Sequence, residues 1–233
     1  DTDINKIDLD GAERMKSILD KYGVRVGIIG SGFGKCSLTD EKEWAEHLEI
    51  LERQFRFCDL FGTRLIRGFP FWLPAGDDWD RSPRPVMADY IERIGDRMTK
   101  AAAMAAKAGV TISIETEPST FSGSCEEAAK IIAAVDSPAL TCCWDIANSW
   151  HFGVPAYPEG YAEIRGKVSH VHVKDISLDP DDPAISTGTT HIDLGDIPYH
   201  DIFRALIRDG YDGLASVETH LFFKMADRFR WLK

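Results

Sequence analysis

The chain has 233 residues, of which 38 are acidic and 27 basic, so its formal net charge is -11. This length suits one α/β domain with a substantial core, and the negative charge argues against binding to nucleic acid or to an anionic membrane surface. The five cysteines lack CxxC spacing, which argues against a disulfide framework and favours a reducing, cytoplasmic setting. No apolar run reaches the length of a membrane span. We therefore expect a single domain over residues 1–233 that acts on a small molecule.

The first half of the chain alternates between segments with helical spacing and segments with strand character. Trp44, Leu48, Leu51 and Phe55 recur every three or four residues, as on one face of a helix. In chain order, the pattern predicts a helix over 9–22, a strand over 24–30, a helix over 40–60 and a strand over 63–69.

The same alternation continues to the end of the chain. A Pro- and Trp-rich loop precedes an Ala-rich helix that closes at Gly109. The segment over 176–197 is predicted to be a long loop, in which 189–194 is the weakest of the predicted strands. The remaining predictions are strands over 111–117, 141–146, 169–175 and 214–218, and helices over 125–135, near Tyr161 and over 199–209.

Repeated βα units without a linker favour a parallel sheet in one α/β domain, and the predicted fold is a (β/α)8 TIM barrel. Seven strands are predicted from the sequence, whereas the closed barrel needs about eight. The sequence also opens on a helix. We expect the first strand to lie upstream of residues 1–233 and the last helix, after Glu218, to be incomplete. The alternative is an open sheet.

Four of the predicted strands carry an ionisable side chain near their carboxyl end. The apolar runs TISIETE, TCCWDIAN and LASVETH reach Glu115, Asp145 and Glu218, and SHVHVKD contains His172. Apolar runs of this kind are typical of strands buried on both faces of a parallel sheet. In a barrel, the carboxyl ends of the strands converge on one mouth, where active sites lie. Two glutamates, an aspartate and a histidine would meet there as a divalent metal site.

At these residues the chain resembles the xylose isomerase-like TIM barrel superfamily, the sugar phosphate isomerase and epimerase group that also includes endonuclease IV. The resemblance covers most of the chain, from VRVGIIG to LASVETH, and rests on the order Glu, Asp, His, Glu. It implies that Glu115, Asp145, His172 and Glu218 are the metal ligands. Ketose epimerases of this group typically have a histidine three residues after the aspartate, where this chain has Asn148. This departure concerns the substrate more than the metal.

Carboxylate and imidazole ligands with open positions suit Mn²⁺, Mg²⁺ or Co²⁺, with Zn²⁺ as an alternative. A sugar or sugar derivative could chelate such a metal, which would hold the enediolate that forms when a proton leaves next to the carbonyl. Glu115 and Glu218 come from different sides of the mouth, so one could remove the proton and the other return it to the opposite face. That is epimerisation, whereas one residue moving the proton between adjacent carbons gives isomerisation. We therefore predict a metal-dependent isomerase or epimerase with these two catalytic glutamates.

Further residues around the mouth are predicted to contact the substrate. Glu117 follows Glu115 by two residues and would point to the same side of an extended strand. Lys174 lies two residues after His172 on the same side of the strand and is predicted to be a substrate contact or a rim charge. His170 lies two residues before His172, deeper in the barrel, and is predicted to be a hydrogen-bonded core histidine. An arginine in the strand LIRGF either binds a substrate oxygen or pairs with a barrel acid. The predicted substrate contacts are Arg67, Glu117, Asn148, Lys174 and His220.

Two other functions stay open. One is a metal-dependent hydrolase or lyase of the same fold, either a dehydratase or an endonuclease IV-like enzyme. The endonuclease, however, needs more His and Asp ligands and a surface that tolerates phosphate. The other is a non-catalytic sugar-binding barrel. The sequence is compatible with a monomer and with a homo-oligomer.

The run GSGFGK invites a nucleotide-binding interpretation but does not fit the P-loop pattern. Ile29 stands where the first glycine would be, and Cys36 stands where a Ser or Thr would bind magnesium. We interpret the run as a flexible loop at the mouth of the barrel.

Overall fold

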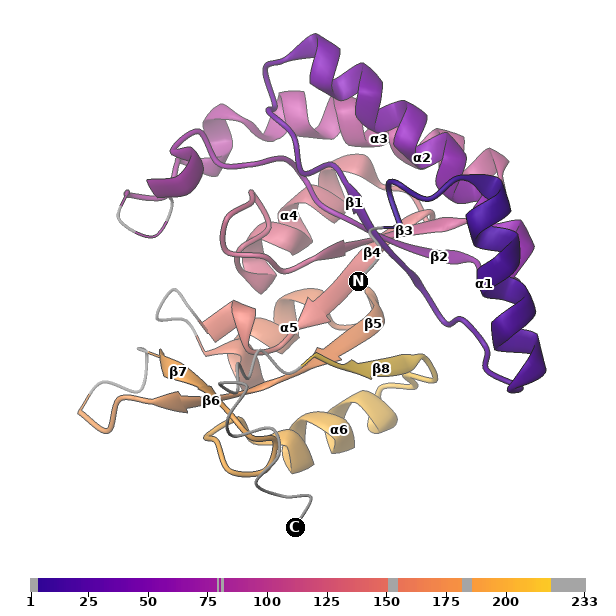
Figure 1. Cartoon of the computed structure of the whole chain (residues 1–233). Helices are drawn as coiled ribbons and strands as arrows, with labels where there is room; N and C mark the ends of the chain where they lie inside the picture. Colours follow the sequence, from indigo (N-terminus) through magenta and orange to yellow (C-terminus); the bar gives the residue numbers. More distant parts are fainter. Residues whose placement is uncertain (1–3, 79, 81, 151–154, 182–185, 219–233) are drawn as a thin grey trace.

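One curved sheet of parallel strands organises the molecule (Figure 1). The structure is a computed structural model and describes residues 4–78, 80, 82–150, 155–181 and 186–218. Within these residues the sheet is an open, barrel-like arrangement, because its two edge strands are not hydrogen-bonded to each other. In spatial order, its strands are β1 (Ile29–Phe33), β2 (Leu65–Gly68), β3 (Thr111–Glu115), β4 (Leu140–Asp145), β5 (Val168–Val173) and β8 (Leu214–Val217).

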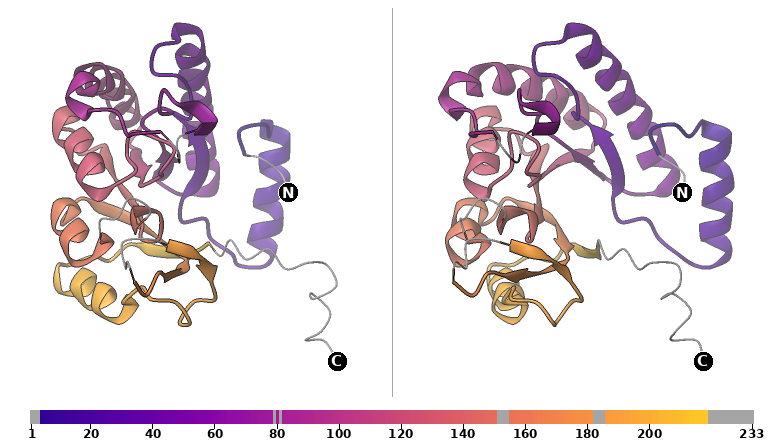
Figure 2. Two further views of the ribbon diagram at one scale, coloured as in Figure 1. Left: turned by 90° about the vertical axis from the view of Figure 1, so that its left-hand side faces the viewer. Right: turned by 60° about the vertical axis from the view of Figure 1, so that its left-hand side comes forward.

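Helices alternate with these strands, as predicted. The α-helices of the described residues are α1 (Leu9–Lys21), α2 (Glu41–Phe61), α3 (Ile91–Lys107), α4 (Cys125–Val135), α5 (Tyr161–Ile164) and α6 (Tyr199–Arg208). Short helical turns occur at η1 (Gly76–Asp78), η2 (Met87–Asp89), η3 (Asn148–Trp150) and η4 (Ala156–Gly160). Figures 1 and 2 show α2 to α6 following one face of the sheet, with α1 beside α2. The prediction of a parallel α/β barrel architecture is confirmed.

Local sequence signals fix the ends of the central helices. Asp40 caps α2 by accepting hydrogen bonds from the backbone N–H groups of Lys42 and Glu43, and the helix ends at Gly62, whose φ of 72° is left-handed. Ser124 and Glu127 form a capping box at the start of α4. The apolar faces of these helices pack against the sheet in one continuous cluster of buried side chains. The two helices that were predicted over 40–60 and 125–135 are therefore confirmed.

The strand predicted over 189–194 is wrong in both its bounds and its place. The structure has β7 (Ser186–Thr190), which pairs antiparallel with β6 (Asp175–Leu178) in a hairpin outside the parallel sheet. The parallel strands of the described residues therefore number six rather than seven. The buried Asp175 carboxylate accepts hydrogen bonds from the backbone N–H groups of Asp193, Gly195 and Ile197. These bonds hold the segment after β7 as a loop.

The first strand lies later in the sequence than predicted. β1 covers residues 29–33 rather than 24–30, so most of the glycine-rich run is strand and the loop interpretation is wrong there. The Phe69 N–H donates to the Phe33 carbonyl at 2.8 Å, which extends the contact between neighbouring chains to the end of β1. Gly34 follows with a φ of 84°, and a Cβ there would lie 1.8 Å from the Phe69 carbonyl oxygen. The glycine therefore permits a close approach of two backbones.

The five cysteines are all buried and free, as expected for a chain without a disulfide framework. No helix in the described part of the chain is both long enough and apolar enough to cross a membrane.

Candidate metal centre

Four predicted ligands meet at the carboxyl end of the sheet. Glu115 ends β3, Asp145 ends β4, His172 lies near the end of β5, and Glu218 directly follows β8. These strands are consecutive neighbours in the sheet, and the Glu218 N–H continues the β5–β8 pairing by donating to the Val173 carbonyl at 2.9 Å. One donor atom from each of the four side chains lies within 4.8 Å of the others. The prediction that the four side chains point into one place is confirmed.

His172 lies at the centre of this cluster. Its Nδ1 is 3.4 Å from Glu115 Oε1, 3.2 Å from Glu218 Oε2 and 3.7 Å from Asp145 Oδ2. Burial would lower the pKa of His172, but contacts with Asp145, Cys143, Glu115 and Glu218 outweigh it and raise the pKa. The three carboxylates therefore favour a positive charge at this point.

Two further cations complete the charge balance of the cluster. Arg67 Nη1 is 3.2 Å from Glu115 Oε2 and 3.8 Å from Glu218 Oε1. Lys174 Nζ is 2.8 Å from Asp145 Oδ2, and burial, which would lower its pKa, is outweighed by this carboxylate. Burial likewise would raise the pKa of Glu218, but His172, Lys174 and Arg67 lower it to about 2. Glu218 is therefore ionised at neutral pH.

The donor set fits a divalent cation. Glu115 Oε2, Asp145 Oδ2 and His172 Nδ1 are buried and make ion pairs of 3.2, 2.8 and 3.7 Å, but none of these contacts has the geometry of a hydrogen bond. Buried polar atoms are normally hydrogen-bonded, so such atoms call for another partner. Three carboxylates and one imidazole form a mixed oxygen and nitrogen set that suits Mg²⁺, Mn²⁺, Co²⁺ or Zn²⁺. The cluster is therefore a candidate metal site.

A hydrogen-bond network fixes Asp145. The Thr116 hydroxyl donates to the Asp145 carbonyl and accepts from the Asp145 N–H, both at 2.9 Å. The Asn148 N–H donates to Asp145 Oδ1 at 2.9 Å, and Asn148 Nδ2 donates to the Thr116 carbonyl at 3.0 Å. Asn148 therefore supports the carboxylate of a candidate ligand, and its predicted contact with a substrate stays a prediction.

The other predicted substrate contacts differ in their places. Arg67 and Lys174 belong to the cluster, and Lys174 is only 4% exposed, so the alternative of a rim charge is wrong. Glu117 lies apart from it: β3 ends two residues earlier, so the strand alternation does not extend to Glu117, which pairs with Lys35 at 3.3 Å. His220 lies outside the described residues. His170 is a buried core histidine as predicted, with Nε2 2.8 Å from Ser216 Oγ.

Sequence reasoning missed three residues that shape the site. Thr116 carries no signal of its own, since its role comes from a contact between neighbouring strands. Cys143 Sγ lies 3.6 Å from His172 Nε2, and its position two residues before Asp145, on the same side of β4, could have indicated this. Asp175 is buried and holds the loop after β7 through its carboxylate.

Comparisons with known proteins agree with this architecture. The family model of the xylose isomerase-like TIM barrel matches residues 1–233. A protein from Mycobacterium smegmatis, described as a xylose isomerase-like TIM barrel protein in complex with magnesium, is 19% identical with a TM-score of 0.75, over 94% of this chain and 74% of that one. At this identity, the likeness shows the fold.

Two enzymes with different activities share the fold. The probable 3-DHS dehydratase AsbF of Bacillus anthracis is 20% identical with a TM-score of 0.69, over 94% of this chain and 78% of that one. The 3-keto-D-glucoside 4-epimerase YcjR of E. coli is 16% identical with a TM-score of 0.69, over 95% of this chain and 82% of that one. The fold alone therefore does not choose the reaction.

Proposed function

The chain belongs to the xylose isomerase-like TIM barrel family, and we propose that it is a divalent-metal-dependent sugar isomerase or epimerase. The observation that carries this proposal is the approach of two glutamates, from two different strands of the sheet, to one imidazole. Glu115 and Glu218 come from the two ends of the run β3-β4-β5-β8 and lie 3.4 Å and 3.2 Å from His172 Nδ1. Two carboxylates in this arrangement can reach opposite faces of one bound carbon.

Glu115, Asp145, His172 and Glu218 would hold the metal ion. When bound, a divalent cation polarises a substrate carbonyl and stabilises the negative charge that develops on its oxygen. The magnesium in the Mycobacterium smegmatis relative supports a hard cation at such a site. Asp145 is 0% exposed and fixed by Thr116 and Asn148, so its part in the proposal is to bind and orient.

The two glutamates would move the proton next to the carbonyl. Glu218 is ionised, so it can accept that proton and later return it to solvent. Glu115, carrying a proton taken up from solvent, can deliver it to the substrate, and Arg67 contacts both side chains. Delivery to the opposite face of the same carbon inverts it, whereas transfer to the neighbouring carbon isomerises the sugar.

A lyase is the second candidate, because Lys174 places a buried ammonium 3.7 Å from Glu218 Oε2. A cation in this position could donate a proton to a departing hydroxyl after Glu218 has taken one from the neighbouring carbon. The probable dehydratase from Bacillus anthracis supports keeping this reaction in view.

Proton exchange with solvent tests both candidates. The protein is loaded in turn with Mg²⁺, Mn²⁺, Co²⁺ and Zn²⁺ and incubated with a panel of ketoses and 3-keto-glucosides in deuterated buffer, and NMR locates the label. We expect metal-dependent deuterium at a carbon next to the carbonyl, in a product of unchanged composition. A product that has lost water assigns the lyase. Turnover without any exchange, or no metal-dependent reaction across the panel, contradicts the proposal.

A further inference from the structure

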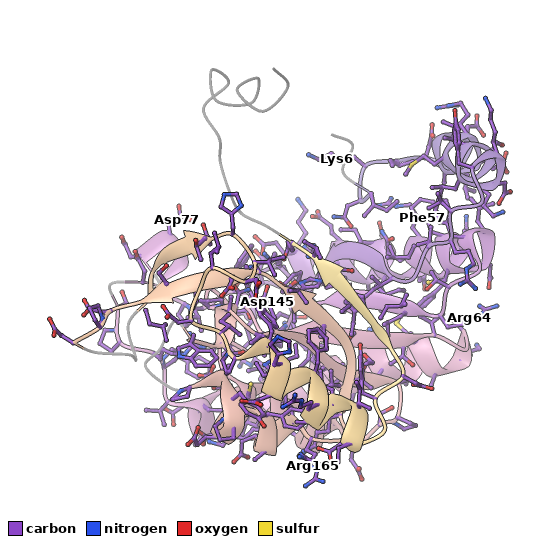
Figure 3. All side chains as sticks on the ribbon, turned by 90° about the horizontal axis from the view of Figure 1, so that it is seen from below. Lys6, Phe57, Arg64, Asp77, Asp145 and Arg165 are labelled. Atoms are coloured by element: carbon purple, nitrogen blue, oxygen red, sulfur yellow. The ribbon has the colours of Figure 1, made fainter. Side chains whose placement is uncertain are left out.

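A cavity of about 730 Å³ lies beside the loops that follow β1, β2 and β3. These loops are at the carboxyl end of the sheet, the end that carries the candidate metal centre. In Figure 3, Asp77, which lines this cavity after β2, and Arg64, which precedes β2, lie on opposite sides of Asp145. Cavities of this volume are typical of small-molecule sites. We call it the side pocket and define it by Ser37, Thr39, Trp72, Asp77, Tyr90 and Ser119.

The side pocket has an aromatic wall. The rings of Tyr90 and Phe121 pack together with centroids 5.0 Å apart, and Phe121 is buried. Trp72 is 36% exposed, whereas its neighbours Phe71 and Leu73 are buried. An exposed indole offers a flat apolar face on which the C–H side of a sugar ring can stack.

The polar lining of the side pocket is neutral or acidic. Ser37, Thr39 and Ser119 supply hydroxyl groups, and Glu43 and Asp77 supply carboxylates. Among the described residues that line the pocket there is no lysine or arginine. Carboxylates accept hydrogen bonds from sugar hydroxyls but repel phosphate and carboxylate groups. The nearest cation, Lys35, lies 5.0 Å from the Trp72 ring centroid and is already paired with Glu117. The lining therefore favours an uncharged polyol over a phosphorylated sugar.

A short chain of contacts connects the side pocket with the candidate metal centre. Lys35 Nζ lies 5.0 Å from the Trp72 ring centroid and 4.3 Å from that of Phe69. The Arg67 guanidinium lies 5.2 Å from the same Phe69 ring and reaches the metal centre through its ion pair with Glu115. Lys35, Phe69 and Arg67 therefore lie between the two sites.

Glu117 lies apart from the metal cluster but contacts the side pocket. It follows the candidate ligand Glu115 by two residues, and its Oε1 accepts a hydrogen bond from Ser119 Oγ of the side pocket at 3.0 Å. Its Oε2 pairs with Lys35, and the two side chains are 21% and 29% exposed. The Lys35–Glu117 pair therefore stands at the boundary between the two sites.

The walls of the side pocket are fixed by the protein. Arg84 donates to the carbonyls of Pro118 and Thr120, each at 2.8 Å, which holds the loop after β3. Phe71 is buried with a φ of 70°, and its N–H donates to the Gly34 carbonyl at 3.0 Å. A phenylalanine in the left-handed region persists only where its surroundings impose it, and such positions cluster at functional sites. This backbone sets the direction of the neighbouring Trp72.

We infer that the side pocket binds a second, uncharged sugar ring, so that the substrate is a glycoside rather than a free or phosphorylated monosaccharide. The reacting ring then lies at the candidate metal centre, and the second ring stacks on Trp72. The inference rests on the proposed function for the reacting ring only, because stacking in the side pocket requires no metal.

Calorimetric titration tests the inference on the whole chain with cellobiose, maltose, glucose and glucose 6-phosphate. We expect at least one disaccharide to bind about tenfold more tightly than glucose, the effect of one good stacking contact. We expect Trp72→Ala to abolish that preference and Trp72→Phe to restore part of it. The matched control is Tyr22→Ala, since Tyr22 is an aromatic residue that is 69% exposed at the end of α1 and does not line the pocket.

The outcomes separate this inference from the proposed function. Equal binding of disaccharides and glucose, or a preference that survives Trp72→Ala, overturns the inference. The inference is also overturned if glucose 6-phosphate binds more tightly than glucose and this difference in affinity is lost in Trp72→Ala. A Trp72-dependent disaccharide preference supports the side pocket even where the exchange experiment shows no metal-dependent reaction, which would contradict the proposed function alone. Thermal unfolding of the Trp72 variants confirms that each is folded before it is titrated.

Discussion

The two ends of the same three strands carry very different polar groups. Midway along β3 and near the amino ends of β4 and β5, the hydroxyls of Ser113, Thr141 and Ser169 form a small cluster. Ser169 Oγ lies 2.7 Å from Ser113 Oγ and 2.6 Å from Thr141 Oγ1. These groups are uncharged and bond to one another. We call them the hydroxyl cluster.

Near the carboxyl ends, the same strands carry Glu115, Asp145 and His172. Here the charges are buried, and several donor atoms make no hydrogen bond. A buried polar cluster that satisfies itself contributes to the fold, whereas a buried charged cluster with unsatisfied atoms is costly for stability and is typical of functional sites. The comparison therefore assigns the hydroxyl cluster to structure and the candidate metal centre to function.

The largest expected effect is on catalysis at the charged end. Replacing Glu115 or Glu218 by Gln keeps the shape of the side chain but removes its ability to accept a proton. We expect the turnover number to fall by roughly two to four orders of magnitude in each variant. Steady-state kinetics on the substrate found by the exchange experiment measures this, with Glu126→Gln as the matched control because Glu126 pairs with Lys130 on the surface. A Glu115 variant as active as that control would remove Glu115 from the reaction.

The next effect concerns metal-linked stability. A ligand at one hundred times its dissociation constant stabilises the folded state by about 2.7 kcal/mol. We expect Mn²⁺ to raise the melting temperature of the wild-type protein, and Asp145→Asn and His172→Gln to lose most of this increase. Differential scanning fluorimetry with and without the ion measures it. An equal increase in all three proteins would place the metal elsewhere.

The hydroxyl cluster should respond in the opposite way. Ser113→Ala removes one hydrogen bond of a neutral, self-satisfied group, so the free energy of unfolding should fall by about 1 kcal/mol. Urea unfolding measures that loss. Metal-dependent stabilisation and turnover should stay within about twofold of the wild type, a change of less than half a kcal/mol. A loss of metal binding in this variant would break the distinction between the two ends.

The smallest expected effect is on the pH dependence of stability, in which two histidines differ. Neighbouring carboxylates raise the pKa of His172, whereas His47 accepts a hydrogen bond from the Gly34 N–H through Nδ1, and burial lowers the pKa of His47. The unfolded chain therefore binds a proton at His47 more readily than the folded chain does. The contribution of His47 to the free energy of unfolding is present above its ordinary pKa of about 6.5 and is lost as the pH falls below that value. Urea unfolding at several pH values should show that the free energy of unfolding of His47→Gln declines less steeply with falling pH than that of the wild type.

Much of the metal centre was predictable because its signal is local. Each ligand stands at or near the end of an apolar run, and strand alternation with parallel pairing then brings the runs together. The bounds of β1 and the pairing of β7 were not predictable, since they depend on contacts such as Phe69 with Phe33 and Asp175 with Gly195. The side pocket was missed for the same reason: its walls come from three loops whose contacts no spacing rule describes.

The hairpin of β6 and β7 also bears on how this protein can change over time. Residues 174–213 lie between β5 and β8, yet the two strands pair directly, with His172 opposite Ser216. The positions of His172 and Glu218 are thus set by the sheet and not by the length of the intervening chain. Insertions or deletions in the hairpin would leave the pairing of β5 with β8, and with it the candidate ligands, in place. The hairpin can therefore vary in length over evolutionary time without moving the cluster.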